Sequence, residues 1–168
     1  MINIVLFEPE IPENTGNIMR TCAATNCKLH LIEPFGFIFD EKRLKRSGAN
    51  YIDNVNYERY IDYDDFFSKN AGEFYYLTRY GTKPYSSIDF SDVNKNIYLI
   101  FGKESTGIPK EILKDNVDRC FRIPTSDNVR ALNLSNCVAL VTYEALRQQN
   151  FPNLLLSDPF KGEEYLKK

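Results

Sequence analysis

The sequence lacks the features that would place this chain in or across a membrane. None of its apolar runs approaches the roughly 20 residues that a membrane-spanning helix needs. The opening segment Met1–Phe7 is apolar, but it has neither the basic start nor the small-residue cleavage site of a signal peptide, and Glu8 and Pro9 end it. We therefore expect a cytoplasmic protein with no membrane partner.

Cysteine and histidine are too few and too scattered to suggest a metal site. No C-x-x-C pair occurs among the four cysteines, which are Cys22, Cys27, Cys120 and Cys137. His30 is the single histidine, whereas zinc sites need several closely spaced cysteine or histidine ligands. We expect no metal, and we interpret the thiols as small buried apolar groups. His30 lies in the alternating segment Lys28–Ile32, which predicts a structural histidine in a strand.

An excess of charge of one sign is also missing. The net charge of −2 gives no overall electrostatic reason to expect nucleic-acid binding. One local cluster differs, because it places four cations within five positions, at Lys42, Arg43, Lys45 and Arg46. Such a cluster is most often a solvated helix face. A nucleic-acid surface would therefore have to be a patch, completed by a second subunit.

Short apolar stretches alternate along the chain with segments of helical pattern. With 43% hydrophobic and 26% charged residues, the 168-residue chain has the composition and length of one globular domain. The expected strands are Ile2–Phe7, Leu29–Ile32, Phe74–Thr78, Ile97–Phe101 and Cys120–Ile123. The expected helices are Asn14–Thr25, Asp62–Lys69, Pro109–Lys114 and Asn133–Gln149. This alternation predicts an α/β fold with a mostly parallel sheet flanked by helices.

The boundaries of these segments carry their own signals. Asn14 or Thr15 is expected to cap the first helix, and Pro109 suits a first helical turn. Apolar residues recur at helical spacing in the last helix, at Leu134, Val138, Val141 and Ala145. We predict one domain over residues 1–155, followed by a tail over 156–168 that leaves the body of the fold.

Three segments rich in glycine, asparagine or serine accompany the expected strands. They are Asn14–Arg20, Ile100–Ile108 and Ile123–Asn136. Loops of this composition at the ends of strands form sites for polar ligands in α/β domains. For each glycine alone a simple turn is the favoured interpretation, but the three segments together favour a binding site.

Two common nucleotide-binding motifs are excluded. Gly102 and Gly107 flank four residues as in a phosphate-binding loop, but Ile108 and Pro109 stand where that motif needs Lys and then Ser or Thr. Pro109 also lacks the N–H that a helix start offers to a phosphate. Asn14–Gly16 lacks the further glycines of a dinucleotide fingerprint. What remains is a loop whose glycines let the backbone approach a ligand closely. Nearby, Ile123 and the backbone of Thr125–Ala131 could enclose a flat, uncharged group such as adenine.

The ordered motifs resemble those of the SPOUT-class RNA 2′-O-ribose methyltransferases. The matching segments are Asn14–Arg20, Phe101–Ile108, Ile123–Pro124 and Leu132–Asn136. Three further segments are similar to the subgroup that methylates the wobble nucleotide of transfer RNA, namely Phe7–Pro12, His30–Pro34 and Asp40–Gly48. The resemblance covers nearly the whole chain, and three ordered motifs are a far more specific signal than any one of them.

This resemblance implies S-adenosylmethionine as the methyl donor, an obligate homodimer, and a C-terminal trefoil knot within the α/β fold. It implies a cofactor pocket made by Leu77, Thr78, Gly102, Gly107, Ile123, Ala131 and Leu132. At Ala131-Leu132 the chain departs from its relatives, in which a small polar residue followed by Met is expected. A backbone contact tolerates that change, whereas a lost side-chain hydroxyl would weaken binding by about 1 kcal/mol.

The resemblance also assigns Arg20 as the catalytic residue that removes the proton of the ribose 2′-hydroxyl. Because guanidinium groups stay protonated in proteins, Arg20 could instead orient the ribose and stabilise the developing alkoxide. The expected substrate-binding residues are Asn14, Lys42, Arg43, Lys45, Arg46, Glu104, Asn133 and Ser135. For Asn133 and Ser135, simple capping of the last helix explains the residue types equally well.

The predicted function is S-adenosylmethionine-dependent 2′-O-methylation of the wobble cytidine or uridine of transfer RNA. Three alternatives stay open: the same reaction on ribosomal RNA, base methylation on the same scaffold, and a catalytically silent RNA-binding module. A wobble base lies in a single-stranded loop and can stack on an aromatic side chain. The sequence does not indicate which tyrosine or phenylalanine would receive it.

Overall fold

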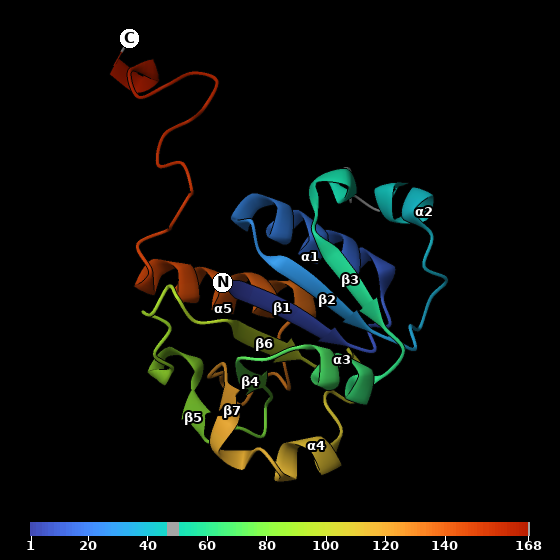
Figure 1. Cartoon of the computed structure of the whole chain (residues 1–168). Coiled ribbons are helices and arrows are strands. Elements are labelled where there is room, and N and C mark those ends of the chain that lie inside the picture. Colours follow the sequence, from blue (N-terminus) through green and yellow to red (C-terminus); the bar gives the residue numbers. More distant parts are fainter. Residues whose placement is uncertain (47–50, 168) are drawn as a thin grey trace.

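One parallel sheet of seven strands forms the centre of the fold (Figure 1). The computed structural model describes residues 1–46 and 51–167. The strands are β1 (Ile2–Phe7), β2 (Lys28–Ile32), β3 (Tyr57–Tyr60), β4 (Glu73–Leu77), β5 (Lys83–Pro84), β6 (Ile97–Phe101) and β7 (Cys120–Arg122). Their order across the sheet is β3-β2-β1-β6-β4-β7-β5, with parallel pairing throughout. Ser47 and Gly48, which end one of the resembling segments, and the tail residue Lys168 lie outside the described residues.

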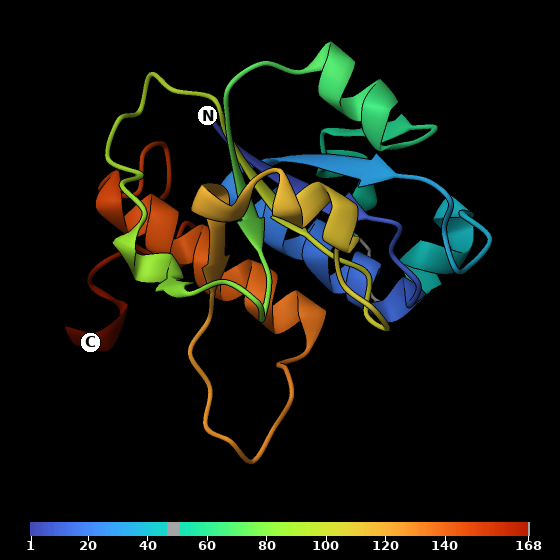
Figure 2. The same ribbon diagram turned by 90° about the horizontal axis from the view of Figure 1, so that it is seen from below.

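Helices cover both faces of this sheet. They are α1 (Pro12–Thr25), α2 (Glu41–Arg46), α3 (Tyr63–Lys69), α4 (Lys110–Lys114) and α5 (Leu134–Gln148). Figure 2 shows α1 and α5 against one face and α3 and α4 against the other. Three short 3-10 turns of the described chain lie between these elements, η1 (Ile52–Asn54), η2 (Tyr85–Ser87) and η3 (Val117–Arg119), and η4 (Tyr165–Lys167) lies in the C-terminal tail. The predicted α/β fold with a mostly parallel, helix-flanked sheet is confirmed.

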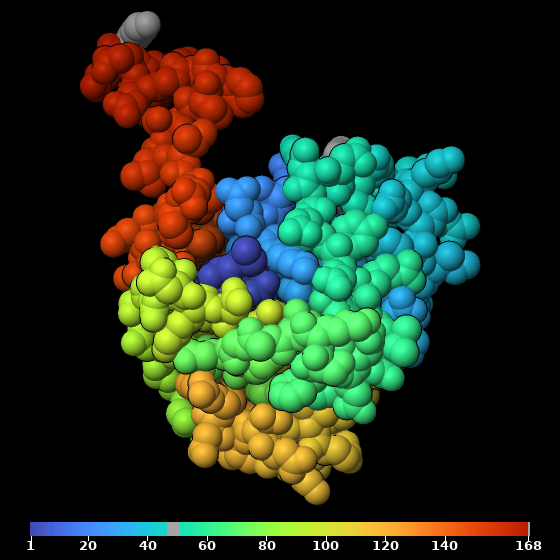
Figure 3. Space-filling model, viewed as in Figure 1, coloured from blue at the N-terminus to red at the C-terminus, as the bar shows by residue number. Residues whose placement is uncertain are grey.

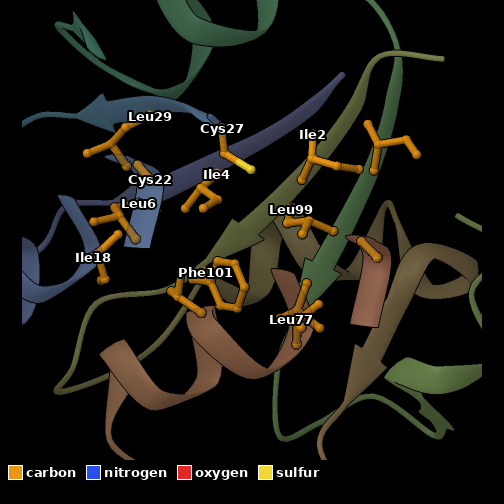
Figure 4. Packing of buried hydrophobic residues seen from close by; sticks show 14 of the residues in the cluster. Ile2, Ile4, Leu6, Ile18, Cys22, Cys27, Leu29, Leu77, Leu99 and Phe101 are labelled. Atoms are coloured by element: carbon orange, nitrogen blue, oxygen red, sulfur yellow. The ribbon is translucent and has the colours of Figure 1, made fainter. Parts of the chain in front are cut away.

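Strand β1 shows why the sheet needs cover on both sides, because all six of its residues are buried. Ile4 and Leu6 belong to the apolar cluster that also contains residues of α1 and α5 (Figure 4). Val5 and Phe7 belong to a second cluster, together with residues of α3 and α4. Successive side chains of a strand point to opposite faces. The apolar run Ile4–Phe7 of β1 therefore contributes side chains to two cores, as expected for a central parallel strand.

The five predicted strands are present to within one residue at each end. Sequence patterns missed two more, β3 and β5, and both run along edges of the sheet. Glu58 and Arg59 of β3 are exposed, so this strand has no apolar run to reveal it. β5 has only two residues, Lys83 and Pro84, and proline in a sheet is confined to edges and strand starts.

The predicted start of the first helix is wrong. α1 begins at Pro12, and Ile11 occupies the N-cap position without a side-chain hydrogen bond. Asn14 and Thr15, the expected caps, lie buried inside the helix. Pro12 fits the first helical position because its ring fixes a helical φ and it has no N–H to satisfy. The amide of Ile11 bonds to a residue of a distant loop instead of to a neighbour, as described below.

The other helix boundaries agree more closely with the sequence. Asp62 caps α3 by accepting a hydrogen bond from the Asp65 amide over 2.8 Å. Pro109 stands one residue before α4, at its N-cap position. Asn133 caps α5, since its Oδ1 accepts from the amides of Ser135 at 2.9 Å and Asn136 at 3.4 Å. The capping interpretation of Asn133 is therefore confirmed.

His30 is a structural residue, as predicted. It is buried in β2, where its Nε2 lies 3.1 Å from Asn3 Oδ1 and its Nδ1 lies 2.8 Å from the Tyr60 hydroxyl. The Asn3 amide nitrogen donates to the Ile97 carbonyl, so Oδ1 is free to accept, which assigns the proton to Nε2. Burial lowers the pKa of His30 to about 4. The imidazole is therefore neutral at physiological pH.

Three of the cysteines are buried as expected, and one differs. Cys22, Cys27 and Cys120 are buried free thiols, whereas Cys137 is half-buried in α5. Burial raises the pKa of each of the four thiols. In the described part of the chain, no group of three or more His, Cys, Asp or Glu side chains could hold a metal ion.

The C-terminal residues extend away from the body after α5 (Figures 1 and 3). Phe151 and Leu154 still pack against the larger core cluster, whereas Leu155 and Leu156 are exposed. No helix over residues 1–46 and 51–167 is long and apolar enough to cross a membrane. The trefoil knot, and the division of the chain at residue 155, stay predictions.

Candidate functional site

A cavity of about 560 Å³ lies where β4, β6 and β7 end. Its walls come from the residues after each of these strands, together with the start of α1 and the first turn of α5. The carboxyl ends of parallel strands open onto the same edge of a sheet, which is where α/β domains place their ligand sites. The three glycine- and asparagine-rich segments, widely separated in the sequence, meet here.

The structure brings together all seven residues that were predicted to contact a cofactor. The cavity is lined by Leu77, Thr78, Gly102, Gly107, Ile123, Ala131 and Leu132. Three of the expected substrate-binding residues, Asn14, Glu104 and Asn133, line it as well. Ser135 lies just behind, in the first turn of α5. Binding by these residues stays a prediction, but their common location is a property of the fold.

The loop after β6 folds back on itself so tightly that glycine is required at its start. A side-chain carbon on Gly102 would lie 2.3 Å from the carbonyl carbon of Gly107 and from the amide nitrogen of Ile108. Gly107 has a φ of +74°, which L side chains rarely adopt, and its amide donates to the Lys103 carbonyl over 2.9 Å. Bare backbone therefore forms this wall of the cavity.

Glu104 holds the start of α1 against this loop. Its carboxylate accepts hydrogen bonds from the amides of Glu10 at 2.8 Å and Ile11 at 3.2 Å, and from Asn14 Nδ2 at 3.1 Å. The first N–H groups at a helix start have no partner within the helix. Glu104 thus satisfies the amide of the N-cap residue Ile11 and fixes this end of the helix to the loop.

Two more contacts complete this link, which we call the loop–helix clasp. The Glu10 carboxylate accepts from the Ser105 amide and hydroxyl, both at 2.8 Å, and Lys103 Nζ lies 2.6 Å from Glu8 Oε2. The hydrogen bonds from Ser105 lower the pKa of Glu10. The loop–helix clasp, formed by residues 8–14 and 103–105, fixes one side of the cavity to the other.

Asn133 connects the third segment to the clasp. Its Nδ2 donates to Asn14 Oδ1 over 3.0 Å, while its Oδ1 accepts from the Ser135 hydroxyl over 2.6 Å and from two amides of α5. The polar atoms of Glu104, Asn14 and Asn133 therefore bond to one another or to backbone. This geometry favours the structural interpretation of Asn133, Ser135 and Glu104 over direct substrate contact.

Arg20 does not reach the cavity of its own chain. It is exposed on α1, and its guanidinium carbon lies 5.3 Å from the centre of the Tyr51 ring. Arg20 is six positions after Asn14 in the chain. Its Cα therefore lies about 9 Å further along the helix and about 120° around the helix axis from that of Asn14. A site that uses both the cavity and Arg20 must therefore take one of them from a second molecule.

The basic cluster lies on α2, which packs against α1 and η1 rather than beside the cavity. Lys45 Nζ is 2.8 Å from Asp53, and Arg43 Nε is 4.0 Å from Asp40. Lys42, Arg43 and Arg46 are exposed. The structure thus separates the predicted phosphate contacts from the predicted cofactor pocket within one chain.

Sequence reasoning missed an aromatic residue and several cations of the cavity. They are Arg79, Tyr80, Lys103, Arg122 and Arg130. Arg79 and Tyr80 lie between Thr78, the first residue after β4, and Gly81, and this strand–turn boundary is the signal that could have revealed them. The Nε of Arg122 is buried without a hydrogen-bond partner in the described structure. A buried donor without a partner suits a ligand acceptor such as a carboxylate.

The cavity suits the predicted cofactor. Its volume falls within the range of small-molecule sites, roughly 300–1,000 Å³. Leu77, Ile123 and Leu134 supply apolar wall, the loop at Gly102 supplies bare backbone, and Arg122 supplies an unsatisfied donor. These are the groups that an adenine ring, a ribose and a carboxylate would need.

Known proteins are similar to this chain along most of its length. The profile of the SpoU rRNA Methylase family matches residues 1–143. A protein of Escherichia coli (strain K12) named tRNA (cytidine(34)-2'-O)-methyltransferase is 44% identical over 160 residues, which cover 94% of this chain and all of that protein. A Geobacillus stearothermophilus protein, provisionally named for the same activity, is 58% identical over 154 residues, covering 91% of this chain and 98% of its own.

Solved structures share the fold. One described as giving structural insights into the 2-OH methylation of C/U34 on tRNA has a TM-score of 0.80 and 34% identity, covering 89% of this chain and 97% of its own. The SpoU methyltransferase AviRb of Streptomyces viridochromogenes, solved in complex with the cofactor AdoMet, has a TM-score of 0.72 and 20% identity, covering 88% of this chain and 57% of its own. At 20% identity, the similarity to AviRb shows a shared fold only.

Proposed function

The chain belongs to the SpoU rRNA methylase family, and we propose that it methylates the ribose 2′-hydroxyl of cytidine or uridine 34, the wobble nucleotide, of transfer RNA. The observation that carries this is identity along almost the whole chain to proteins named for that reaction, such as the Escherichia coli relative. Although the family description mentions ribosomal RNA, the Escherichia coli and Geobacillus stearothermophilus relatives, which match this chain in length, are named for transfer RNA. A cytoplasmic location stays a prediction.

S-adenosylmethionine is the proposed methyl donor, and it would supply a methyl group activated by a positively charged sulfur. Leu77 and Ile123 would enclose its adenine, while the backbone at Gly102, Ala131 and Leu132 would contact its polar edges. Ala131 has no hydroxyl to contribute, so the proposal requires a main-chain contact at this position. The loop–helix clasp would keep these walls in place while the substrate binds.

The reaction holds the ribose 2′-oxygen in line with the methyl group. The oxygen–carbon bond forms as the methyl–sulfur bond breaks, S-adenosylhomocysteine leaves, and the hydroxyl proton passes to water. Such a step gains from a closed site and from fixed orientation of the reacting atoms. Arg20 is the proposed catalytic residue. Because a guanidinium stays protonated, its proposed role is to hold the ribose through a neighbouring phosphate and to stabilise the alkoxide as it forms.

A homodimer would bring Arg20 to the reaction. Arg20 is exposed on α1 and lies away from the cavity of its own chain, so a second copy would have to present it. The neighbouring helix α5 exposes Leu140 and Tyr143, apolar surface that a second copy would cover. The basic residues of α2 would then extend the RNA-binding surface across two subunits.

The test is transfer of labelled methyl from S-adenosylmethionine to transfer RNA that lacks wobble methylation. Wild type should yield labelled 2′-O-methylcytidine or 2′-O-methyluridine after digestion to nucleosides. Arg20→Ala should lower kcat by about 100-fold or more, whereas Lys69→Ala, an exposed helical cation on the opposite face of the sheet, should not. Label in a base, or label in ribosomal RNA alone, would contradict the proposal.

Mixed dimers test the shared site. Neither Arg20→Ala nor Gly102→Val alone should be active, but a mixture refolded together should recover about a quarter of wild-type activity if each site joins one cavity to the partner's arginine. No recovery, with mixed dimers demonstrated by two different tags, would mean that Arg20 acts within its own chain or not at all.

A further inference from the structure

A tight turn after β4 presents two adjacent residues at the rim of the cavity. The Gly81 amide donates to the Thr78 carbonyl over 3.1 Å, which places Arg79 and Tyr80 at the two central positions of the turn. Gly81 is wedged against the backbone of Phe121, which a side-chain carbon would approach to 2.6 Å. The turn is therefore fixed to the sheet, and the two side chains it presents have a rigid base.

Tyr80 is an aromatic ring with one face supported and the other open. The guanidinium carbon of Arg79 lies 4.8 Å from the ring centre, and Arg79 Nη2 donates to the Tyr80 hydroxyl over 2.6 Å. The residue nevertheless remains 64% exposed. A large apolar ring held in place but left in solvent gains little for stability, because its surface is not removed from water. It is instead suited to receive a second flat group.

The charges around the cavity point to an anionic ligand. Among the described residues, four cations line it, Arg79, Lys103, Arg122 and Arg130, against the single acid Glu104. Lys103 is paired with Glu8, and the Glu104 carboxylate is already hydrogen-bonded to backbone amides. The proposed methyl donor has a net positive charge, since its sulfur and amino group outweigh one carboxylate. The excess of arginine in a chain of net charge −2 therefore suits a phosphate group.

We propose that Tyr80 is the platform on which the base of the target nucleotide stacks, and that Arg79 and Arg130 contact the adjoining phosphates. A ribose whose 2′-hydroxyl enters the cavity must leave its base at the rim, where the open face of Tyr80 lies. Stacking on an aromatic side chain beside cations is the usual way in which proteins hold an unpaired nucleotide. This inference rests on the proposed function and deepens it by assigning a positioning residue for the substrate.

Kinetics with two substitutions separate the ring from its hydroxyl. Tyr80→Ala should raise KM for transfer RNA about ten-fold, a loss typical of one stacking contact, while Tyr80→Phe should stay near wild type. The dissociation constant for S-adenosylmethionine, measured by calorimetry without RNA, should stay the same in both. If Tyr80→Ala instead weakened S-adenosylmethionine binding and left KM for transfer RNA unchanged, Tyr80 would cover the cofactor and the proposal would be wrong.

The tail offers a matched control. Tyr165 is 54% exposed, and Lys161 Nζ lies 4.2 Å from its ring centre, so it too is an exposed ring paired with a cation. It belongs to η4, far from the cavity (Figure 1). Tyr165→Ala should leave KM for transfer RNA unchanged. A ten-fold rise with this variant as well would show that exposed tyrosines act nonspecifically, and it would overturn the assignment.

Crosslinking provides a readout that is independent of activity. An anticodon stem-loop with 5-iodouridine at the target position should, on irradiation with wild type, attach to the peptide that contains Tyr80, and Tyr80→Ala should abolish that product. Attachment to a different aromatic residue, with Tyr80→Ala behaving as wild type, would overturn the proposal. Absence of RNA binding by wild type would instead count against the proposed function, so the two failures are distinguishable.

Discussion

Asn133 donates a hydrogen bond to Asn14 over 3.0 Å, although 119 residues separate them in the chain. Asn14 in turn donates to Glu104 over 3.1 Å, so one side chain from each of the three motif segments joins a single chain of hydrogen bonds. The walls of the cavity are thus fixed to one another by residues that first suggested a substrate site. Their main effect is to hold the shape of the cavity.

Two substitutions at Asn133 should separate capping from this link. Asn133→Ala removes the cap of α5 and should lower the free energy of unfolding by about 1 kcal/mol. Asn133→Asp keeps an accepting oxygen for the helix but loses the donor to Asn14, so its unfolding free energy should stay closer to that of wild type while its affinity for S-adenosylmethionine falls. Urea unfolding and calorimetry measure the two quantities. Equal affinity in Asn133→Asp and wild type would show that the link does not shape the cavity.

Glu104 should behave as a structural residue. Glu104→Ala leaves the Glu10 and Ile11 amides without their acceptor and should lower the free energy of unfolding by about 1–3 kcal/mol. Glu164→Ala is the control, because Glu164 is exposed and its pairing with Lys167 at 2.8 Å contributes little. Both are measured by urea unfolding. An unchanged unfolding curve for Glu104→Ala, with transfer activity abolished, would instead support the predicted direct role of Glu104 in substrate binding.

The two glycines of the loop after β6 should respond differently to substitution. Gly102→Ala introduces a carbon 2.3 Å from backbone atoms and should distort the loop, with a loss of S-adenosylmethionine affinity of about ten-fold or more. At Gly107 the space is open and only φ is restrictive, so Gly107→Asn should be tolerated better, because asparagine adopts positive φ more readily than most residues. Calorimetric titration with S-adenosylmethionine measures the affinity of both variants. A greater loss of affinity in Gly107→Asn than in Gly102→Ala would contradict this account of the loop.

The buried histidine predicts a pH dependence of stability. The pKa of His30 is about 4 in the folded chain, against an ordinary value of 6.5 for an exposed histidine, so the unfolded chain binds a proton that the folded chain excludes. Stability contributed by neutral His30 is complete above pH 6.5 and is lost as the pH falls from 6.5 towards 4, with a slope of up to about 1.4 kcal/mol per pH unit.

His30→Gln provides the comparison for that dependence. Urea unfolding between pH 7.5 and 5 should show a smaller loss of stability for His30→Gln than for wild type, because the variant has no imidazole to protonate. This window lies above the range in which carboxylates such as Glu58 and Glu73, whose pKa values are lowered by their ion pairs and hydrogen bonds, take up protons. Parallel curves for the two proteins would show that His30 does not cause the acid sensitivity.

The local features of this fold follow from the sequence. The five apolar strands, the helical spacing in α5 and the Asn133 cap depend on neighbours within a few residues, and the structure confirms them. The family resemblance likewise placed seven cofactor-pocket candidates, and the fold gathers all of them around one cavity. Patterns of this kind are readable because backbone geometry sets the periods of strands and helices, 2.0 and 3.6 residues.

What the sequence did not determine depends on contacts between distant segments. The start of α1 at Pro12 depends on a carboxylate that lies 94 positions along the chain from the Glu10 amide it accepts from. The edge strands β3 and β5 form because a parallel neighbour is already in place, not because their residues are apolar. Arg20 turns away from the cavity, and Tyr80 sits at its rim, through helix rotation and turn geometry. Local composition does not determine such contacts, because the order of the strands in the packed sheet decides which loops face each other.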